Sequence, residues 1–356
     1  MIKTRVVIVG AGLSGLYAAY LLEQAGVDYL LLEGRERVGG RIVQAPGSQA
    51  DLGATWIWPG IQPALNQLLA RLGIDIFVHQ ETGDMLFERG DNTPSRHPGF
   101  VSSPAAARAR GGMSRLIAAL KQQIEPARIM TGMQVTQAEQ RDEQIAVTCL
   151  AADKQYVSVQ GDHLLLALPP MLASAIAFLP ALPPPLLQAW RNTGTWMAPH
   201  AKYVALYDHG FWKNNGLSGE ARSSAGPMVE IHDVSEPDEM FALFGFIGVP
   251  FAARQALGEE QLQKLCKAQL VRLFGAEAAF PRAEYLKDWA GDPFTATSRD
   301  LTLPAGHAVP PAWPTEGRWS RVVTGIASEW SHDFPGYIAG AIEAAEEGVK
   351  RILNRS

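Results

Sequence analysis

The chain has 356 residues, of which 47% are hydrophobic and 19% charged, which is enough apolar material for a large core and too little charge for disorder. Its length excludes a small disulfide module and favours two interlocked domains or one large α/β unit. The net charge of −5 disfavours a nucleic-acid partner.

Cysteine usage and two charge-free stretches bear on the cellular setting. Cys149 and Cys266 lie far apart and lack the paired spacing of a metal site, so we interpret both as core thiols of a protein in a reducing cytoplasm. Residues 6–22 hold three glycines and no small-residue cleavage pattern follows, which does not fit a secretory signal. Leu164–Trp190 contains six prolines, which exclude a continuous membrane helix. We therefore predict no membrane segment.

The same proline-rich stretch has an alternative interpretation inside a soluble fold. Leu164–Leu168 is typical of a buried strand, and Pro170 can open a short helix. The prolines that follow, up to Trp190, predict a linker where the chain leaves one domain for another.

A glycine fingerprint near the amino terminus predicts a dinucleotide site. Residues 5–9 are typical of a buried strand, and Gly10-Ala11-Gly12-Leu13-Ser14-Gly15 leads directly into a helical pattern. Gly10 permits the tight turn, Gly12 lets a pyrophosphate approach the backbone, and Gly15 lets helix and strand touch. The helix amino terminus offers N–H groups to the phosphate charge.

The next strand and loop narrow the choice of dinucleotide. The strand Tyr29–Leu32 ends in Glu33, which can accept hydrogen bonds from both hydroxyls of an adenosine ribose and would repel a 2′-phosphate. This favours FAD or NAD over NADP. The loop Glu36–Arg41 has two adjacent glycines flanked by arginines, and can hold a pyrophosphate from the opposite side. This second phosphate contact favours FAD.

In these segments the sequence resembles the flavin-containing amine oxidase family, which includes monoamine oxidases, polyamine oxidases and L-amino-acid oxidases. The loop Arg37–Arg41 resembles its second glycine motif, and Asp51–Trp56 resembles the segment beside the flavin ring. Gly111–Met113, which opens an amphipathic helix, and His163–Pro170 also resemble FAD segments. Val322–Leu353 resembles the closing FAD motif, in which a strand leads through an acidic turn and Gly-Tyr into a long helix.

The resemblance implies an α/β fold with two parts. One is a Rossmann-like FAD-binding domain of the double-glycine flavoprotein type, which we expect at residues 1–75, 106–190 and 290–356. The other is a smaller α+β substrate domain, which we expect at residues 76–105 and 191–289.

The fingerprint, the strand ends and the resemblance together imply that FAD is the cofactor. The residues expected to bind it are Gly10, Gly12, Leu13, Ser14, Gly15, Glu33, Gly34, Arg35, Gly39, Gly40, Arg41, Gly53, Ala54, Thr55, Trp56, Val135, Trp289, Ser328, Glu329, Gly336, Tyr337 and Ile338. Ser298 stands where monoamine oxidases carry the cysteine bonded to the flavin, so the resemblance implies noncovalent FAD. A helix amino terminus after Gly336-Tyr337 would stabilise negative charge on the reduced flavin.

Two residues are the catalytic candidates. Lys202 lies in a predicted strand, Ala201–Leu206, and Phe211-Trp212 follow at the family spacing. The resemblance implies that Lys202 holds a water against the reactive nitrogen of the flavin. Tyr337 matches the family tyrosine that forms one wall of an aromatic cage, whose ring face orients the amine.

The second wall of the cage is less well defined by the sequence. Aligning Trp289 with a family tryptophan places Arg299 where monoamine oxidases have the second tyrosine. Trp56, Trp289 and Phe294 are the alternatives for closing the cavity.

The resemblance implies an FAD-dependent oxidase of a small-molecule amine. A hydride passes from the amine-bearing carbon to the flavin, the imine hydrolyses, and molecular oxygen reoxidises the flavin to give hydrogen peroxide. No metal is expected. Two alternatives stay open: a desaturase or dehydrogenase of the same fold, and a flavin-binding protein without turnover. Lys202 before Phe-Trp favours amine oxidation, whereas Arg299 and the unusual Ala327–Trp330 keep the non-catalytic alternative open.

Overall fold

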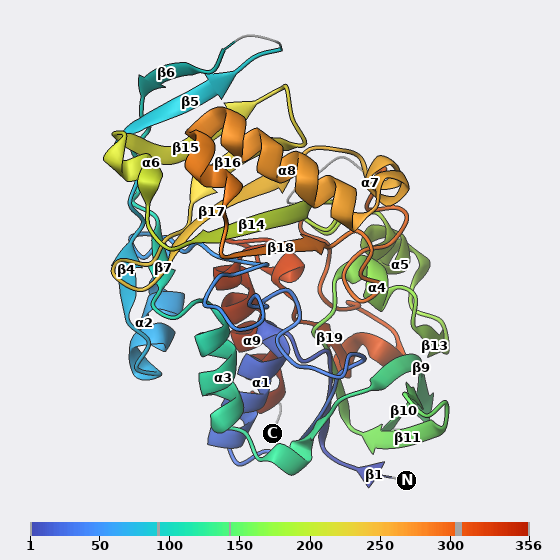
Figure 1. Ribbon diagram of the computed structural model, residues 1–356. Coiled ribbons are helices and arrows are strands. Elements are labelled where there is room, and N and C mark those ends of the chain that lie inside the picture. The colour runs from blue at the N-terminus through green and yellow to red at the C-terminus, as the bar shows by residue number, and fades with distance from the viewer. Residues whose placement is uncertain (1, 91–92, 142–143, 303–307, 355–356) are drawn as a thin grey trace.

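A parallel sheet lies at the centre of the computed structural model, which describes residues 2–90, 93–141, 144–302 and 308–354 (Figure 1). Within these residues its order is β19-β12-β2-β3-β8, and all neighbours run parallel. The strands are β2 (Val6–Val9), β3 (Tyr29–Leu32), β8 (Ile129–Met130), β12 (His163–Leu166) and β19 (Val323–Gly325). Sheets of this kind are covered on both faces, which explains why β2 and β3 are wholly apolar.

Alternate residues of β2 point into different cores. Val6 and Ile8 pack against helices α1 (Leu13–Gln24), α3 (Ser114–Gln122) and α9 (Ile338–Leu353). Val7 and Val9 pack against the other layer, a sheet of order β1-β11-β10-β9-β13. Its strands are β1 (Ile2–Lys3), β9 (Met133–Arg141), β10 (Gln144–Ala151), β11 (Tyr156–Gly161) and β13 (Ala177–Leu179). The half of the molecule built on the parallel sheet therefore has three layers.

The proline-rich stretch is more structured than the sequence suggested. The short helix after Pro170 is confirmed as α4 (Pro170–Ala173). The linker prediction is wrong, because β13 and helix α5 (Pro184–Arg191) follow, and Trp190 of α5 is fully buried. Pro183 and Pro184 stand at the start of α5, where a helix needs no N–H donor, so these prolines begin an element instead of preventing one.

A larger, mostly antiparallel sheet forms the other half of the molecule. Within the described residues its order is β18-β14-β17-β16-β15-β5-β6. The strands are β5 (Asp84–Glu88), β6 (Ser95–Pro98), β14 (Ala201–Tyr207), β15 (Leu217–Ser223), β16 (Met228–Asp233), β17 (Phe241–Ile247) and β18 (Ala283–Asp288). Helix α8 (Glu259–Phe274) lies along the outer face (Figure 1), and its Cys266 is buried there, as Cys149 is in β10. Both cysteines are core thiols, as predicted.

The strand predicted around Lys202 is confirmed as β14. All its residues are buried, because α8 covers one face and the loop around Leu52 covers the other. Val204 and Leu206, on the same face as Lys202, pack against Leu52. Lys202 therefore points toward the half of the molecule built on the parallel sheet.

Smaller elements connect these layers. They are α2 (Pro63–Arg71), β4 (Ile76–Val78), β7 (Ala107–Ala109), α6 (Phe211–Asn214), α7 (Phe251–Leu257) and short 3-10 helices at Pro126–Arg128, Ala276–Ala279, Arg318–Arg321 and Ser328–Trp330. Among the helices described, none combines the length and the apolar character that crossing a bilayer requires.

Candidate active site

A cavity of about 670 Å³ lies between the carboxyl ends of the parallel strands and the inner face of the large sheet. This is within the usual range of ligand pockets, about 300–1,000 Å³. Lys202 lines it, and so do all but three of the residues predicted to bind the cofactor. The three that lie outside the lining are Gly15, Val135 and Glu329.

The fingerprint glycines form the turn between β2 and α1. Gly10 has φ +100°, and a Cβ there would lie 2.7 Å from the carbonyl oxygen of Ala167. A Cβ at Gly15 would lie 1.9 Å from the carbonyl oxygen of Gly10, so Gly15 is required for packing and not for lining the cavity. The turn brings bare backbone and the start of α1 to the cavity wall.

Glu33 is a buried carboxylate at the end of β3. Its two oxygens accept hydrogen bonds from the backbone N–H of Ala11, at 2.7 Å, and of Arg35, at 2.9 Å. These bonds fix its orientation while the residue lines the cavity. The arrangement suits a carboxylate that accepts from ribose hydroxyls.

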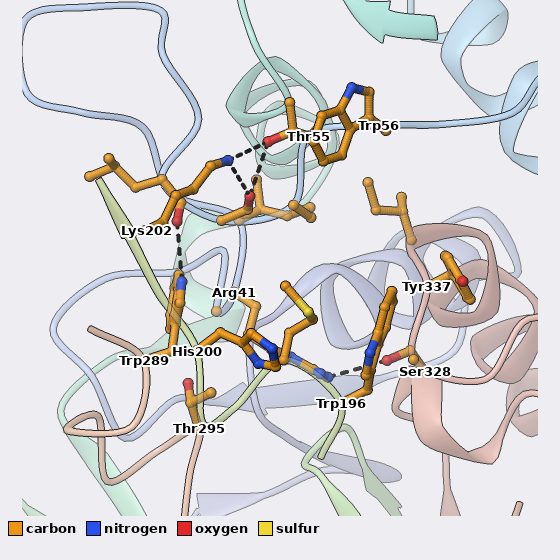
Figure 2. Close-up of a pocket in the computed structure, with 18 of the residues that line it drawn as sticks. Arg41, Thr55, Trp56, Trp196, His200, Lys202, Trp289, Thr295, Ser328 and Tyr337 are labelled. Carbon is orange, nitrogen blue, oxygen red and sulfur yellow. Dashed lines mark hydrogen bonds between the residues drawn. The ribbon is translucent and has the colours of Figure 1, made fainter. Parts of the chain in front are cut away.

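The second glycine loop meets the first. Gly39 forms a backbone bridge with Gly12, and a Cβ on Gly40 would lie only 3.1 Å from the Cα of Gly12. Nearby, Arg41 binds Glu329 at 2.6 Å and donates to the Ser328 hydroxyl at 3.2 Å (Figure 2). Glu329 therefore orients the Arg41 guanidinium, and Glu329 can do so without lining the cavity itself.

Val135 lies elsewhere. It is on β9, pairs with Cys149 of β10 and packs at the edge of the core between the two sheets of the FAD-binding half. The structure does not bring it to the cavity wall.

Lys202 is buried and held by the segment that resembles the flavin-side motif. Its Nζ donates to the Thr55 hydroxyl at 2.8 Å and to the Gly53 carbonyl at 3.2 Å (Figure 2). It also lies 4.1 Å from the ring centre of Phe244, a cation–π contact. A Cβ at Gly53 would lie 1.8 Å from the carbonyl oxygen of Arg41, so only glycine fits there.

Burial and neighbouring charges set the protonation of this lysine. Burial lowers the pKa of Lys202 to about 7; Asp51 raises it and Arg108 lowers it further. Burial raises the pKa of Asp51 to about 6, against the effects of Lys202 and Arg108. Asp51 also accepts the backbone N–H of Met113 at 3.0 Å, which ties the glycine turn before α3 to this charge cluster.

The amino terminus of α9 reaches the cavity at Gly336, Tyr337 and Ile338. Tyr337 contacts the ring of Trp196, with centroids 4.9 Å apart, and that of Trp58 at 5.8 Å. Figure 2 shows Tyr337 and Trp196 on the same side of the cavity. Arg299, the aligned position for a second wall, is exposed, binds Asn192 and does not line the cavity.

Sequence reasoning missed the loop before β14. Trp196, Met197 and His200 all line the cavity, although their segment has no periodic pattern. Their position a few residues before Lys202 was the available signal. Burial lowers the pKa of His200 and Arg254 lowers it further, whereas the Met197 backbone raises it.

Sequence reasoning also missed the polar end of the cavity. Trp56 contacts the rings of His232, at 5.1 Å, and of His79, at 5.8 Å. Glu81 and Glu220 line the cavity beside these histidines. These residues come from three separate segments, so no local motif could have grouped them.

The cavity residues fit FAD. The glycine turns leave room where a Cβ would collide, Glu33 suits a ribose, and two helix amino termini face the cavity. Neither cysteine is among the described lining residues, so the lining offers no thiol for a covalent flavin link.

Comparisons with known families agree with this geometry. The family described as flavin-containing amine oxidoreductase matches residues 77–353, and an NAD(P)-binding Rossmann-like domain matches residues 8–72. The Mycobacterium tuberculosis protein AofH, whose name describes it as a flavin-containing monoamine oxidase, is 25% identical to this chain. The alignment covers 98% of this chain and 96% of AofH. Amine oxidase B of Sus scrofa is 23% identical over 99% of this chain and 86% of its own. The AofH alignment runs over 447 positions, so AofH has stretches that this chain lacks.

Solved structures share the fold. Wild-type putrescine oxidase bound to putrescine has a TM-score of 0.79 at 20% identity, covering 99% of this chain and 100% of its own. Cyclohexylamine oxidase from Brevibacterium oxydans IH-35A has a TM-score of 0.82 at 19% identity, covering 99% of each chain. With the family match spanning most of the sequence, the chain belongs to the flavin-containing amine oxidoreductases and is an FAD-dependent enzyme that acts on amines.

Proposed function

We propose that this chain is an oxidase that converts an amine to an imine, which hydrolyses in water to a carbonyl compound and ammonia or a smaller amine. When bound, FAD accepts a hydride from the carbon that bears the neutral amine, and molecular oxygen removes the electrons as hydrogen peroxide. The observation that carries the proposal is the buried Lys202 in an aromatic cavity built on a dinucleotide fold.

Lys202 is suited to hold a water near the reacting groups. Two of the three N–H groups on its Nζ donate to Thr55 and Gly53, which leaves the third for an ordered water. Because burial brings the pKa of Lys202 to about 7, it can gain or lose a proton in the physiological range. Its role would be to deliver or accept a proton as oxygen is reduced.

The aromatic wall is suited to orient the substrate. Tyr337 and Trp196 contact each other with ring centroids 4.9 Å apart and planes tilted by 46°, so together they form an aromatic wall against which a neutral amine can be placed. Placing the nitrogen fixes the adjacent C–H bond, and such positioning is a large part of what an enzyme contributes.

The charged lining favours an amine over an amino acid. The arginines of the described lining are Arg35, Arg41 and Arg222, and each forms an ion pair with a protein carboxylate. An amino-acid substrate needs a cation to receive its carboxylate. The arginine nearest the polar end, Arg222, is paired with Glu230.

A peroxide-coupled screen of the holoenzyme over primary amines, diamines and amino acids tests the proposed reaction. We expect peroxide release and anaerobic bleaching of the flavin with at least one amine. Bound flavin that no amine reduces would support the non-catalytic alternative, and reduction without a reaction with oxygen would indicate a dehydrogenase.

The role of Lys202 is tested by rapid kinetics of Lys202→Met. We expect the reaction of the reduced enzyme with oxygen to slow by about a hundredfold or more. Lys264→Met, on the exposed side of α8, is the matched control and should keep the wild-type rate. An unchanged oxygen reaction in Lys202→Met would refute the assigned role.

A further inference from the structure

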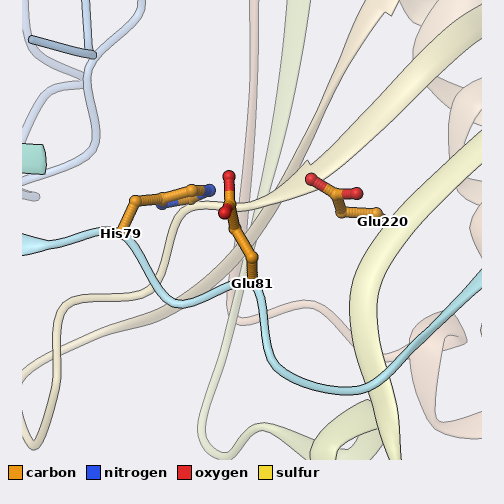
Figure 3. Close-up of side chains that lie close together, drawn as sticks. All are labelled: His79, Glu81 and Glu220. Carbon is orange, nitrogen blue, oxygen red and sulfur yellow. The ribbon is translucent and has the colours of Figure 1, made fainter. Parts of the chain in front are cut away.

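Three side chains form a compact group of acceptors at the polar end of the cavity. His79, Glu81 and Glu220, which we call the distal acceptor cluster, each offer one atom, and these atoms all lie within 4.8 Å of one another (Figure 3). His79 and Glu81 precede β5, whereas Glu220 is on β15. All three line the cavity that also contains Lys202.

The carboxylates of Glu81 and Glu220 are held in place, but neither is paired with a described lysine or arginine. Glu81 accepts the N–H of Ser102 at 2.7 Å and its hydroxyl at 2.8 Å. Glu220 lies 3.4 Å from His232, and neither carboxylate forms an ion pair with any described lysine or arginine. The cluster therefore has two formal negative charges facing a partly apolar cavity, which is an unfavourable arrangement without a ligand.

His79 is aimed into the same space. His79 is only 8% exposed, and its imidazole makes no hydrogen bond to a described residue. Figure 3 shows its ring directed toward Glu81. Burial lowers the pKa of His79 to about 4, and Arg108 adds to this, so at neutral pH the ring is uncharged and one nitrogen can accept a hydrogen bond.

We propose that the distal acceptor cluster binds a second ammonium group of the substrate, so that the chain prefers diamines over monoamines. This inference rests on the proposed amine oxidation. An ammonium has three N–H donors, and three acceptors at about 2.9 Å in tetrahedral directions lie about 4.7 Å apart. The cluster offers three acceptors within that span.

The wall between the two ends of the cavity suits the spacer of such a molecule. Trp56 contacts His79 at one side and Phe244 at the other, and Phe244 covers the Nζ of Lys202. Phe246 lines the cavity beside them. A methylene chain along Trp56 and Phe246, which both line the cavity, would carry one nitrogen toward Tyr337 and the other to the distal acceptor cluster.

Steady-state kinetics with three substrate series test the inference: α,ω-diamines, n-alkylamines, and amino alcohols of matching length. We expect the wild-type enzyme to prefer the best diamine over its amino alcohol by about tenfold or more in kcat/KM. Glu81→Gln and Glu220→Gln should each lose about ten- to a hundredfold in kcat/KM with diamines and lose less with n-alkylamines, so the preference for diamines should fall. Glu239→Gln, an exposed change of the same charge, should leave the preference intact.

Binding supplies a readout that does not depend on turnover. The diamine and the amino alcohol are titrated calorimetrically into dithionite-reduced holoenzyme without oxygen, and the Kd for the diamine should weaken in both Glu variants by the factor seen in kcat/KM. FAD content and thermal unfolding verify that the variants fold.

The outcomes separate this inference from the function it rests on. Failure of every amine to reduce the flavin would reject the proposed oxidation itself. Oxidation of monoamines with no preference for diamines, or a preference that survives both Glu variants, would reject only the distal site. Stoichiometric binding of Zn²⁺ that Glu220→Gln abolishes would also reject it, in favour of a metal site.

Discussion

Lys202 shows how far a single residue can be understood from sequence. The strand position and the Phe-Trp spacing identified it, but nothing local predicted its partners. Thr55 lies 147 residues away in the chain, and Phe244 is on the neighbouring strand. Desolvation and charge depend on these distant groups, so the shift in the Lys202 pKa could not be derived from the sequence.

The pair of Asp51 and Lys202 gives a prediction of direction. Asp51 is the neighbour that raises the pKa of Lys202, whereas burial and Arg108 lower it. Asp51→Asn should therefore move the pKa of Lys202 below about 7, and a pH step in the oxygen reaction should shift toward acid. Rapid kinetics between pH 5 and 9 measure this. Lys202→Met should lack the step, and an alkaline shift in Asp51→Asn would contradict the account.

The same lysine should also make the free energy of unfolding depend on pH. Its folded-state pKa of about 7 lies below the unfolded value of about 10.4, so between these pH values the unfolded chain binds a proton that the folded chain does not. The unfavourable contribution of this buried lysine to folding therefore shrinks as pH rises from 8 to 10, and the protein becomes more stable. Denaturant unfolding at both pH values should show a gain in wild type that Lys202→Met lacks. An equal response of the two proteins would indicate an unshifted lysine.

The residues that sequence missed share one property. Trp196 and His200 lie in a loop, and His79, Glu81 and Glu220 come from segments that meet only in the folded chain. Such groupings depend on tertiary contacts, which periodicity does not report.

Among the elements, those with a strong local pattern were predicted well. Tyr29–Leu32 has the predicted bounds, and β2 begins one residue later than expected. The long helix predicted after Tyr337 is confirmed as α9. Helix α5 was not predicted because proline breaks the interior of a helix, although at a helix start proline is favourable.

The contact between α1 and the glycine turn predicts the effect of one methyl group. In Gly15→Ala the new Cβ would lie 1.9 Å from the carbonyl oxygen of Gly10, so turn and helix must separate. We expect a loss of about 1–3 kcal/mol in unfolding free energy and weaker FAD binding. At Gly60 a Cβ meets nothing nearer than 3.8 Å, so Gly60→Ala is the control for denaturant unfolding. Equal stability of the two variants would show that the turn adapts.

At the scale of the whole molecule, the cavity lies between the two halves, which makes the cofactor a structural link. Removing FAD should therefore lower the melting temperature. With free FAD at a hundred times its Kd, the linkage is worth about 2.7 kcal/mol, or about 4 °C for a chain of 356 residues. Thermal unfolding of the holoprotein and the deflavinated protein measures this.

Riboflavin serves as the control for that measurement. It lacks the adenosine and pyrophosphate that Glu33 and the Gly10 turn are suited to hold, so it should restore less than half of the lost stability. Full recovery with riboflavin, or no change on removing FAD, would contradict the assignment of these residues.

The order of strands in the parallel sheet has a consequence for synthesis on the ribosome. The glycine turn after β2 is made early, but β2 pairs with β12, and β12 with β19, while α9 packs against α1. The growing polypeptide therefore holds an open sheet edge and an uncovered apolar helix until translation is almost finished. Chaperones that shield nascent chains would be needed most by this half of the protein, and a stalled or prematurely stopped product should aggregate instead of capturing the cofactor.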